Sequence, residues 1–373
     1  MLRDDVQLVS VNDHIVEPAG LFADRLPARW VDAGPTVIDQ PGVMAWRLGT
    51  EVSVAVSTSL QEGESPTDEQ VGRVERMWAA AGDPSARLAA MDADRIAVHA
   101  LFPHAMGFAG EKLRFLGAEL WTLCVSAYND FVLSEYCGAD RRRLAGVAIL
   151  PLADSKAAAA EVERVAALDA RGVSFPHNPV HLGLPSLYED HWDPVLDAVG
   201  AAGIPLFLHI GTGSPLTTAA AAPFEVVLSL ATLDALTAMT DLAFSPVLER
   251  HPQLHVVLLE AGISWIPFMT ERIDYFWARQ GATAGGREPP SRRLRRQVLA
   301  AFIDDPAGMS RLDDVGAERV LWMSDFPHPD SAWPDSRSRL VRALEGVADD
   351  DAAAIAEGNA RALLRLPRAQ PAR

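Results

Sequence analysis

The segment SVNDHIVEP near the N-terminus gathers several side chains that can bind a metal ion or form hydrogen bonds. It overlaps the end of the apolar run VQLVSV, and such a run is typical of a buried strand. Side chains alternate between the two faces of a strand, so the pattern predicts Ser10, Asn12 and His14 on one face. Asp13 falls on the opposite face, and Glu17 follows in the next turn. The segment therefore predicts Asn12, His14 and Glu17 as ligands at a strand end.

Other short apolar runs end in side chains of the same kinds. They are His209 in PLFLHIG, Glu260 in VVLLEAG, Asp325 in VLWMSDFPH and His177 after GVSFP. If these runs are parallel strands, their ends meet at one face. Imidazoles together with carboxylates suit zinc, manganese or iron better than calcium or magnesium. A single histidine or aspartate has a simpler structural explanation, but the coincidence at several strand ends favours a site for one or two divalent metal ions.

Further residues fall near the same predicted face. Asp325 and Glu260 are the candidates for acid or base catalysis, because a carboxylate beside a metal can take or give a proton. His104 in LFPH follows a strand and is a candidate to contact substrate. His328 is expected to form a hydrogen bond near Asp325, and Trp265 to wall an apolar pocket. We therefore predict His104, His328 and Trp265 as substrate-binding residues.

Strands that would hold these residues alternate with Ala-rich segments of helical period, and this alternation predicts βαβ units. The expected strands are 6–12, 96–102, 144–150, 172–175, 205–210, 254–260, 299–303 and 319–324. The expected helices are 84–94, 112–136, 154–170, 187–202, 225–250, 262–279, 306–316 and 336–346. Eight such pairs predict an α/β fold, a (β/α)₈ TIM-like barrel. An open doubly wound sheet also fits the alternation, but no G-x-G-x-x-G follows the first strand.

Two regions fit the barrel less simply. The seventh strand is ambiguous, because LAAFIDD fits equally well as the end of a helix that begins at Arg292. Residues 18–83 are too long for one β/α step, and they contain VMAWRLG and EVSVAVS, which predict a small hairpin. We interpret 1–373 as a single barrel domain in which 18–83 form an insertion over the catalytic face.

The bulk composition narrows the class of protein. The chain has 373 residues, 49% hydrophobic and 22% charged, as expected of a globular protein with a large core. Its net charge of −17 argues against nucleic acid and membrane partners. The sequence shows no apolar signal core and no uncharged apolar run of about 20 residues, so we expect a cytoplasmic protein. Cys124 and Cys137 are expected to be reduced packing residues.

Motifs distributed along nearly the whole chain carry a family resemblance. They are VNDHIVEP, LGLPSLYEDHWDPVLDA, LFLHIGTGS, HPQLHVVLLEAGISWIPFMTERID, FIDDPAG, VLWMSDFPHPDSAWP and GNARALLRL. The set resembles the amidohydrolase superfamily, in particular the amidohydrolase-related branch that includes aminocarboxymuconate semialdehyde decarboxylase and other metal-dependent decarboxylases. The resemblance implies a metal-containing barrel. Homodimers are common in that family, so a homodimer is an expectation.

The resemblance also assigns residues. The two first-strand ligands of the family fall on Asn12 and His14, its fifth-strand histidine on His209, and its eighth-strand aspartate, a ligand and proton-handling group, on Asp325. Two positions depart from the family pattern. Position 12 is commonly His, Glu or Asp in relatives, and the decarboxylases carry a histidine where this chain has Glu260. A glutamate there more naturally binds metal or acts as a base.

Three functions follow as expectations. The first is a metal-dependent enzyme that hydrolyses a small carboxylated or acylated molecule or cleaves a C–C bond without oxidation, as in decarboxylation. The second is a non-heme diiron monooxygenase that hydroxylates a hydrophobic or CoA-linked acid, for example a terpenoid, because the carboxylates and histidines suffice for two metals. The third is a barrel that binds a ligand without turnover. In each case the expected partner is a small molecule.

Overall fold

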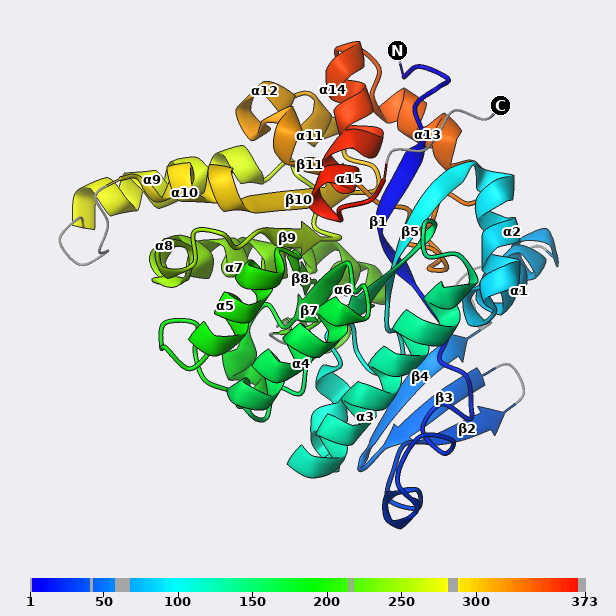
Figure 1. Cartoon of the computed structure of the whole chain (residues 1–373). Helices are drawn as coiled ribbons and strands as arrows, with labels where there is room; N and C mark the ends of the chain where they lie inside the picture. Colours follow the sequence, from blue (N-terminus) through cyan, green and yellow to red (C-terminus); the bar gives the residue numbers. More distant parts are fainter. Residues whose placement is uncertain are drawn as a thin grey trace.

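The computed structural model describes residues 2–40, 43–57, 68–213, 216, 218–280 and 288–367. Eight parallel strands form one sheet in the order β1-β5-β6-β7-β8-β9-β10-β11, with helices around it (Figure 1). The strands are β1 (Leu8–His14), β5 (Ile96–Phe102), β6 (Leu144–Ala148), β7 (Gly172–Phe175), β8 (Leu206–His209), β9 (Val256–Leu259), β10 (Val298–Phe302) and β11 (Val320–Trp322). This nearly closed sheet confirms the predicted (β/α)₈ barrel.

Main-chain hydrogen bonds join the end of β1 to the residues that follow β11. The amide of Asp325 donates to the carbonyl of Asn12 at 3.0 Å, and the amide of His14 donates to the carbonyl of Phe326 at 2.6 Å. These two bonds cross the seam between the first and last strands. They place the residues after β11 directly beside the polar end of β1.

A β-bulge in β1 changes the predicted alternation of its side chains. Ser10 pairs with His99 of β5, but Asp13 pairs with Leu101, so β1 has one extra residue between these pairs. Val9 and Val11 consequently pack inside the barrel. Because of the bulge, the side chain of Asn12 points into the barrel mouth although Val11, the residue before it, also points inward. The prediction that Ser10 lies on the same face as Asn12 and His14 is therefore wrong. Bulges that re-aim side chains are common next to functional sites.

The ambiguous seventh strand is resolved as a helix followed by a strand. Helix α10 (Pro290–Gln297) ends where β10 begins at Val298. Strand β10 pairs in parallel with β9 on one side and β11 on the other. The apolar part of the run is therefore a buried strand, which completes the barrel.

The helices lie around the sheet and mostly follow the predicted ranges. Asp305 accepts a hydrogen bond from the amide of Gly308 and caps the short helix α11. The helices are α1 (Asp68–Gly82), α2 (Pro84–Asp94), α3 (Ala118–Asp130), α4 (Ser155–Ala167), α5 (Asp193–Ala202), α6 (Phe224–Leu230), α7 (Thr232–Phe244), α8 (Val247–Arg250), α9 (Ile266–Gln280), α10, α11 (Pro306–Met309), α12 (Leu312–Val315), α13 (Ser336–Ala343), α14 (Asp349–Ala353) and α15 (Asn359–Leu363).

Between β1 and α2 the chain forms a small antiparallel sheet and helix α1. The sheet contains β2 (Thr36–Gln40), β3 (Val43–Leu48) and β4 (Glu51–Ser57), and the predicted hairpin is the β3–β4 pair. It lies beside the barrel, at the lower right of Figure 1. Residues 41–42 and 58–67 of the predicted insertion lie outside the described residues. The role of 18–83 as a cover of the catalytic face stays a prediction.

Two features bear on the expectations from composition. Cys124 and Cys137 are free thiols buried in the core. Among the described residues, the helical stretch Glu225–Phe244 is long and apolar enough to cross a membrane by length and composition alone. A single stretch of this kind is weak evidence, because core helices of soluble proteins pass the same test. The stretch spans α6 and α7, and its Asp234 accepts a hydrogen bond from the amide of Gly211.

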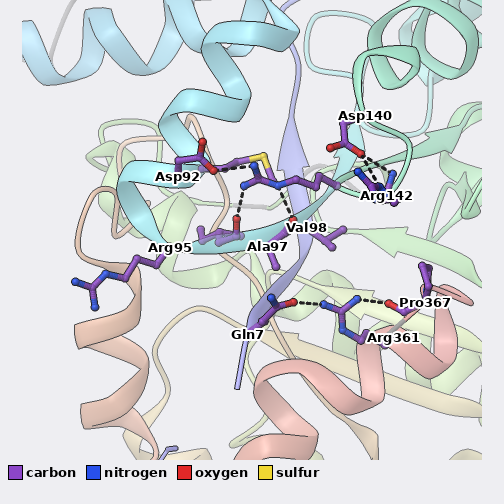
Figure 2. A pocket seen from close by; sticks show the side chains of 12 residues that line it. Gln7, Asp92, Arg95, Ala97, Val98, Asp140, Arg142, Arg361 and Pro367 are labelled. Carbon is purple, nitrogen blue, oxygen red and sulfur yellow. Dashed lines mark hydrogen bonds and ion pairs between the residues drawn. The ribbon is translucent and has the colours of Figure 1, made fainter. Parts of the chain in front are cut away.

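A cavity of about 660 Å³ lies at the end of the barrel where the strands begin (Figure 2). Two of the arginines that line it are already hydrogen-bonded. Arg143 donates to the carbonyls of Ile96 and Ala97, and Arg361 donates to the side chain of Gln7. In barrels of this type the catalytic groups lie at the other end, and this end contributes to stability. We therefore place the candidate site at the carboxyl ends of the strands.

Candidate metal centre

Four strand ends bring two imidazoles and two carboxylates together in the barrel mouth. His14 ends β1, His209 ends β8, Glu260 follows β9, and Asp325 follows β11. The His14 and His209 side chains are fully buried, and those of Asp325 and Glu260 are 2% and 13% exposed. Burying such groups together costs free energy unless they are paired or bind a metal. The sequence correctly predicts that these four residues converge.

Both carboxylate residues have an unusual backbone conformation. The φ angle is +60° at Glu260 and +55° at Asp325. Left-handed backbone is unfavourable for residues other than glycine, and it persists at functional sites where the surrounding structure enforces it. The two residues therefore leave their strands at sharp turns that direct their side chains into the mouth.

Asn12 lies at the centre of this cluster. Its Nδ2 atom is 2.8 Å from Oε1 of Glu260, 3.3 Å from Oδ1 of Asp325 and 3.2 Å from Nε2 of His209. Its Oδ1 atom is buried and has no hydrogen-bond partner among the described residues. An amide that donates to two carboxylates reduces their repulsion, so Asn12 supports the cluster even though it carries no charge.

The tautomers of the two histidines follow from their outer contacts. His14 Nδ1 lies 3.0 Å from the carbonyl of Pro103, and His209 Nδ1 lies 2.8 Å from that of Ile210. Each Nδ1 therefore carries the proton, and each Nε2 presents a lone pair to the cluster. A backbone carbonyl that fixes the ring in this way is common for metal-binding histidines.

The donor set fits a divalent cation. His14 Nε2 is buried without a hydrogen-bond partner in the described part of the chain, yet it faces Oδ1 of Asp325 at 3.2 Å. A lone pair and a carboxylate oxygen repel each other unless a proton or a cation lies between them. Ligand atoms of His14, Glu260, Asp325 and His328 all lie within 4.8 Å of one another. The site can therefore hold a divalent metal ion.

Charge and burial set the protonation of these groups. Burial and the neighbouring His328 lower the pKa of His14 to about 3, so its imidazole is neutral, the form that binds metal. Burial and the charge of Glu260 raise the pKa of Asp325 well above its ordinary value. For Glu260, burial raises the pKa, but the neighbouring His209 and the close contacts with His14 and His209 outweigh burial and hold the pKa well below its usual range. The pair therefore keeps Glu260 ionised and favours a proton on Asp325.

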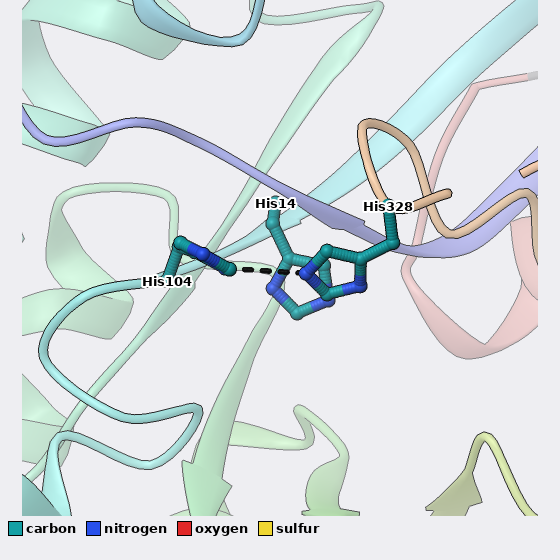
Figure 3. Close-up of side chains that lie close together, drawn as sticks. All are labelled: His14, His104 and His328. Carbon is teal, nitrogen blue, oxygen red and sulfur yellow. Dashed lines mark hydrogen bonds between the residues drawn. The ribbon is translucent and has the colours of Figure 1, made fainter. Parts of the chain in front are cut away.

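Two further histidines extend the site outward (Figure 3). His328 Nδ1 lies 2.8 Å from Oδ2 of Asp325, and His328 Nε2 lies 3.1 Å from Nδ1 of His104. The ring of His328 stacks on that of His14, with centroids 4.3 Å apart. These contacts connect Asp325 through His328 to His104. Ligand atoms of His14, His104 and His328 also lie within 4.8 Å of one another, which forms a second candidate group.

Two aromatic residues that sequence reasoning missed form a wall of the site. The ring centroid of Phe108 lies 4.1 Å from that of His209 and 4.8 Å from that of His14. The ring centroid of Trp78, in α1, lies 5.0 Å from that of His104. Both residues lie outside the predicted strands, and no periodic pattern points to them. They give the metal cluster an apolar, flat neighbour.

Three predicted site residues lie apart from this cluster. Both carboxylate oxygens of Glu17 accept hydrogen bonds from the backbone amides of His104 and Ala105. His177 contacts Thr212 Oγ1 at 3.1 Å through Nδ1 and Asp234 at 3.2 Å through Nε2. Glu17 therefore orders the loop after β5, and His177 supports the loop after β8.

Trp265 is the third of these residues. Its indole Nε1 donates to the carbonyl of Ala261 at 2.9 Å, so the ring is tied to the turn that begins α9. The structure does not bring Glu17, His177 or Trp265 against the metal cluster. Their assignments as ligands or substrate contacts stay predictions.

Comparison with known proteins gives the same family as the motifs. Gamma-resorcylate decarboxylase of Rhizobium sp. (strain MTP-10005) is 28% identical over 263 residues, which cover 64% of this chain and 75% of that protein. A crystal structure of an amidohydrolase from Mycobacterium avium subsp. paratuberculosis K-10 superposes with a TM-score of 0.73 at 21% identity, covering 97% of this chain and 100% of that one.

A dihydroxybenzoic acid decarboxylase from Polaromonas sp. JS666, solved with manganese and the inhibitor 2-nitroresorcinol, has a TM-score of 0.64 at 17% identity, with 98% of each chain covered. At these identities the solved structures establish the shared barrel. The sequence pattern of the amidohydrolase family matches residues 31–366, nearly the whole chain. Since this match spans β5 to β11 and the strand ends that carry His209, Glu260 and Asp325, the chain belongs to the amidohydrolase family of enzymes.

Proposed function

We propose that this chain is a metal-dependent decarboxylase that acts on a small aromatic carboxylic acid. The observation that carries the proposal is the buried set His14, His209, Glu260 and Asp325, which lies beside the aromatic ring of Phe108. The decarboxylase names of the relatives support the reaction and the substrate class. The manganese in one of those structures supports a divalent transition metal.

The cluster would hold one ion through the Nε2 atoms of His14 and His209 and through the carboxylates of Glu260 and Asp325. Rotation of the Asn12 amide about its last bond would offer Oδ1, which now lacks a partner, as a further oxygen ligand. Glu260 would then supply the anionic charge that the neutral Asn12 does not. When bound, the metal would orient the carboxylate of the substrate and an adjacent oxygen of its ring, and would withdraw electron density from both groups.

The proton needed for decarboxylation is assigned to Asp325. Cleavage of the bond between the ring and the carboxylate releases CO₂ and leaves the electron pair on the ring carbon, which must gain a proton. Asp325 lies in the barrel mouth between His14 and His328, where it would pass a proton from His328 to the ring carbon. His328, at 2.8 Å, is placed to return a proton to Asp325 after each turnover.

Phe108 and Trp78 are proposed to bind the ring of the substrate. Their flat faces border His14 and His104, and aromatic pairs gain free energy beyond simple burial. Trp78 belongs to α1, which is part of residues 18–83. This contact supports the proposal that the segment covers the mouth of the barrel and excludes water.

The proposal is tested by incubating the Mn²⁺-loaded protein with 2,6-dihydroxybenzoate and related hydroxybenzoates. We expect CO₂ release and, in D₂O, incorporation of one deuterium at the ring carbon that carried the carboxylate. The metal-free protein is the control and should release none. Hydrolysis of an ester, lactone or amide without activity on any acid would replace decarboxylation by the hydrolase alternative.

The names of the relatives do not support the monooxygenase alternative. The group formed by His14, His104 and His328 is the feature that would accommodate a second ion. Oxygen uptake in the same assay, with a hydroxylated product, would revive that alternative. Membership in an enzyme family leaves the non-catalytic barrel without support.

A further inference from the structure

Asp13 is a buried carboxylate with no assigned role. It lies on β1 between Asn12 and His14, and its side chain is 0% exposed and points away from the barrel mouth. Burying a carboxylate is costly unless it accepts hydrogen bonds or has a nearby positive charge. The partners of Asp13 therefore indicate what the residue does.

Those partners flank Asp325 on both sides. Oδ1 of Asp13 accepts a hydrogen bond from the hydroxyl of Ser324 and another from the backbone amide of Phe326 at 3.2 Å. Asp325 stands between these two residues with a φ angle of +55°. One carboxylate thus holds both neighbours of Asp325, whose backbone is left-handed.

Ser10 adds to the same connection between β1 and the turn after β11. Its hydroxyl oxygen accepts a hydrogen bond from the amide of Ser324 at 2.8 Å. The amide of Asp325 itself donates to the carbonyl of Asn12. Each donor in the turn from Ser324 to Phe326 is therefore bound by β1. The left-handed turn is enforced by these contacts rather than by its own sequence.

Arg87 of α2 completes the arrangement on the side of His14. Its guanidinium is fully buried, donates to the carbonyl of His14 and lies 3.2 Å from Nδ1 of His99. It also lies over the ring of Phe326, 4.7 Å from the centroid. Arg87 therefore contacts the backbone of one candidate ligand and the residue next to the other, and it supplies a positive charge in the same buried layer as Asp13.

We propose that Asp13, with Arg87, is a positioning residue that holds the carboxylate of Asp325 against His14 and thereby prepares the metal site. This inference rests on the metal site of the proposed function. Asp13 acts through the backbone of residues 324–326 and does not touch the ion. Groups that orient metal ligands commonly change metal affinity by about ten- to hundredfold when they are removed.

The test measures Mn²⁺ binding to the full chain by calorimetry. Asp13→Ala should weaken binding about tenfold or more, because neither donor then has its acceptor. Asp13→Asn keeps Oδ1 for both donors and should retain most of the affinity. Ser324→Ala keeps the carboxylate and removes one donor, so its affinity should lie between those of the wild type and Asp13→Ala.

Asp94 offers a matched control. It is also a buried aspartate, 2% exposed, that accepts hydrogen bonds from the hydroxyl and amide of one serine, Ser336, at 2.6 and 2.8 Å. These bonds join α2 to α13 rather than β1 to the metal cluster. Asp94→Ala should lower the melting temperature but leave the Mn²⁺ affinity within about twofold of the wild type, since it removes no contact of a ligand.

The visible absorption bands of the Co²⁺-loaded protein give a second readout, because they report ligand geometry. Asp13→Ala should change these bands, and Asp94→Ala should not. Wild-type affinity and an unchanged spectrum in Asp13→Ala would overturn the positioning role, as would an equal loss of affinity in Asp94→Ala. If Asp13→Ala does not fold, unchanged affinity in Ser324→Ala overturns it. If the wild type binds neither ion, the proposed metal site itself is wrong, and this inference falls with it.

Discussion

The Nε2 atom of His14 lies 3.2 Å from Oδ1 of Asp325, and both side chains are buried. The proton of the His14 ring is on the opposite nitrogen, where it is donated to Pro103. His14 Nε2 therefore presents a lone pair to the carboxyl group of Asp325, and a proton or a cation is needed to hold the two atoms together. A divalent cation held by both atoms would take the place of that proton.

Replacement of Glu260 by Gln tests whether this residue is a ligand. Its Oε1 lies 2.9 Å from His209 Nε2 and 3.6 Å from His14 Nε2, so a neutral amide there removes an anionic oxygen from the site. We expect Mn²⁺ affinity to fall by at least about tenfold, since even outer groups contribute on that order. Calorimetry checks this result. Glu111→Gln, which changes a buried carboxylate bound to the amide of Ala109, should leave the affinity unchanged.

Unchanged metal content together with lost turnover in Glu260→Gln would contradict the ligand assignment. That result would make Glu260 a base that acts on substrate or water. The structure favours the ligand, because the carboxylate is ionised and contacts both histidines.

Replacement of His104 by Gln tests the chain of contacts from Asp325 outward. His104 holds His328 at 3.1 Å, and His328 in turn contacts Asp325. We expect turnover to fall by about a hundredfold, within the range for general acid–base groups, while metal content stays at the wild-type level. Steady-state kinetics and metal analysis of the same preparation check both. His181→Gln, at an exposed position, is the control.

Loss of one metal ion per chain in His104→Gln would contradict this role of His104. It would mean that His14, His104 and His328 hold a second ion, and the relay of protons through His328 would no longer explain the loss of turnover.

Stability should depend on pH through Asp94, which lies away from the metal cluster. Burial raises the pKa of this carboxyl from its ordinary 3.8 to about 6. Between pH 3.8 and pH 6 the folded chain binds more protons than the unfolded chain. The uptake of a proton by Asp94 therefore stabilises the folded chain at low pH, and this stabilisation is lost as the pH rises through 6. The loss amounts to about 3 kcal/mol at most. Asp94→Asn removes the titrating group.

Urea unfolding of the wild type and Asp94→Asn at several pH values from 4 to 7 checks this expectation. The free energy of unfolding of the variant should rise relative to that of the wild type as the pH increases. A constant difference across the range would show that Asp94 titrates at its ordinary pKa in the folded protein.

The amino-acid sequence was sufficient to predict the barrel and the convergence of four side chains of the candidate metal centre. Alternation of apolar runs with helical segments identifies the parallel strands, and parallel strands bring His14, His209, Glu260 and Asp325 to one end. This inference requires only strand direction and position. It therefore holds although the boundaries of several strands differ by one or two residues from those predicted.

Other parts of the site depend on features without a periodic signal. The bulge in β1 gives Asn12 its central place, and alternation alone puts Ser10 beside it. Phe108 and Trp78 come from irregular or inserted segments. Glu17 resembles a ligand in sequence, but its carboxylate accepts hydrogen bonds from two amides of the loop after β5. These contacts can be seen only in three dimensions.

The central claim is that the cluster of His14, His209, Glu260 and Asp325 binds one divalent metal ion. The most direct test is a calorimetric titration with Mn²⁺ of the full chain after a chelator has removed its metal. We predict one ion per chain in the wild type and no measurable binding in His209→Ala. No binding by the folded wild type, or equal binding by His209→Ala, would contradict the account.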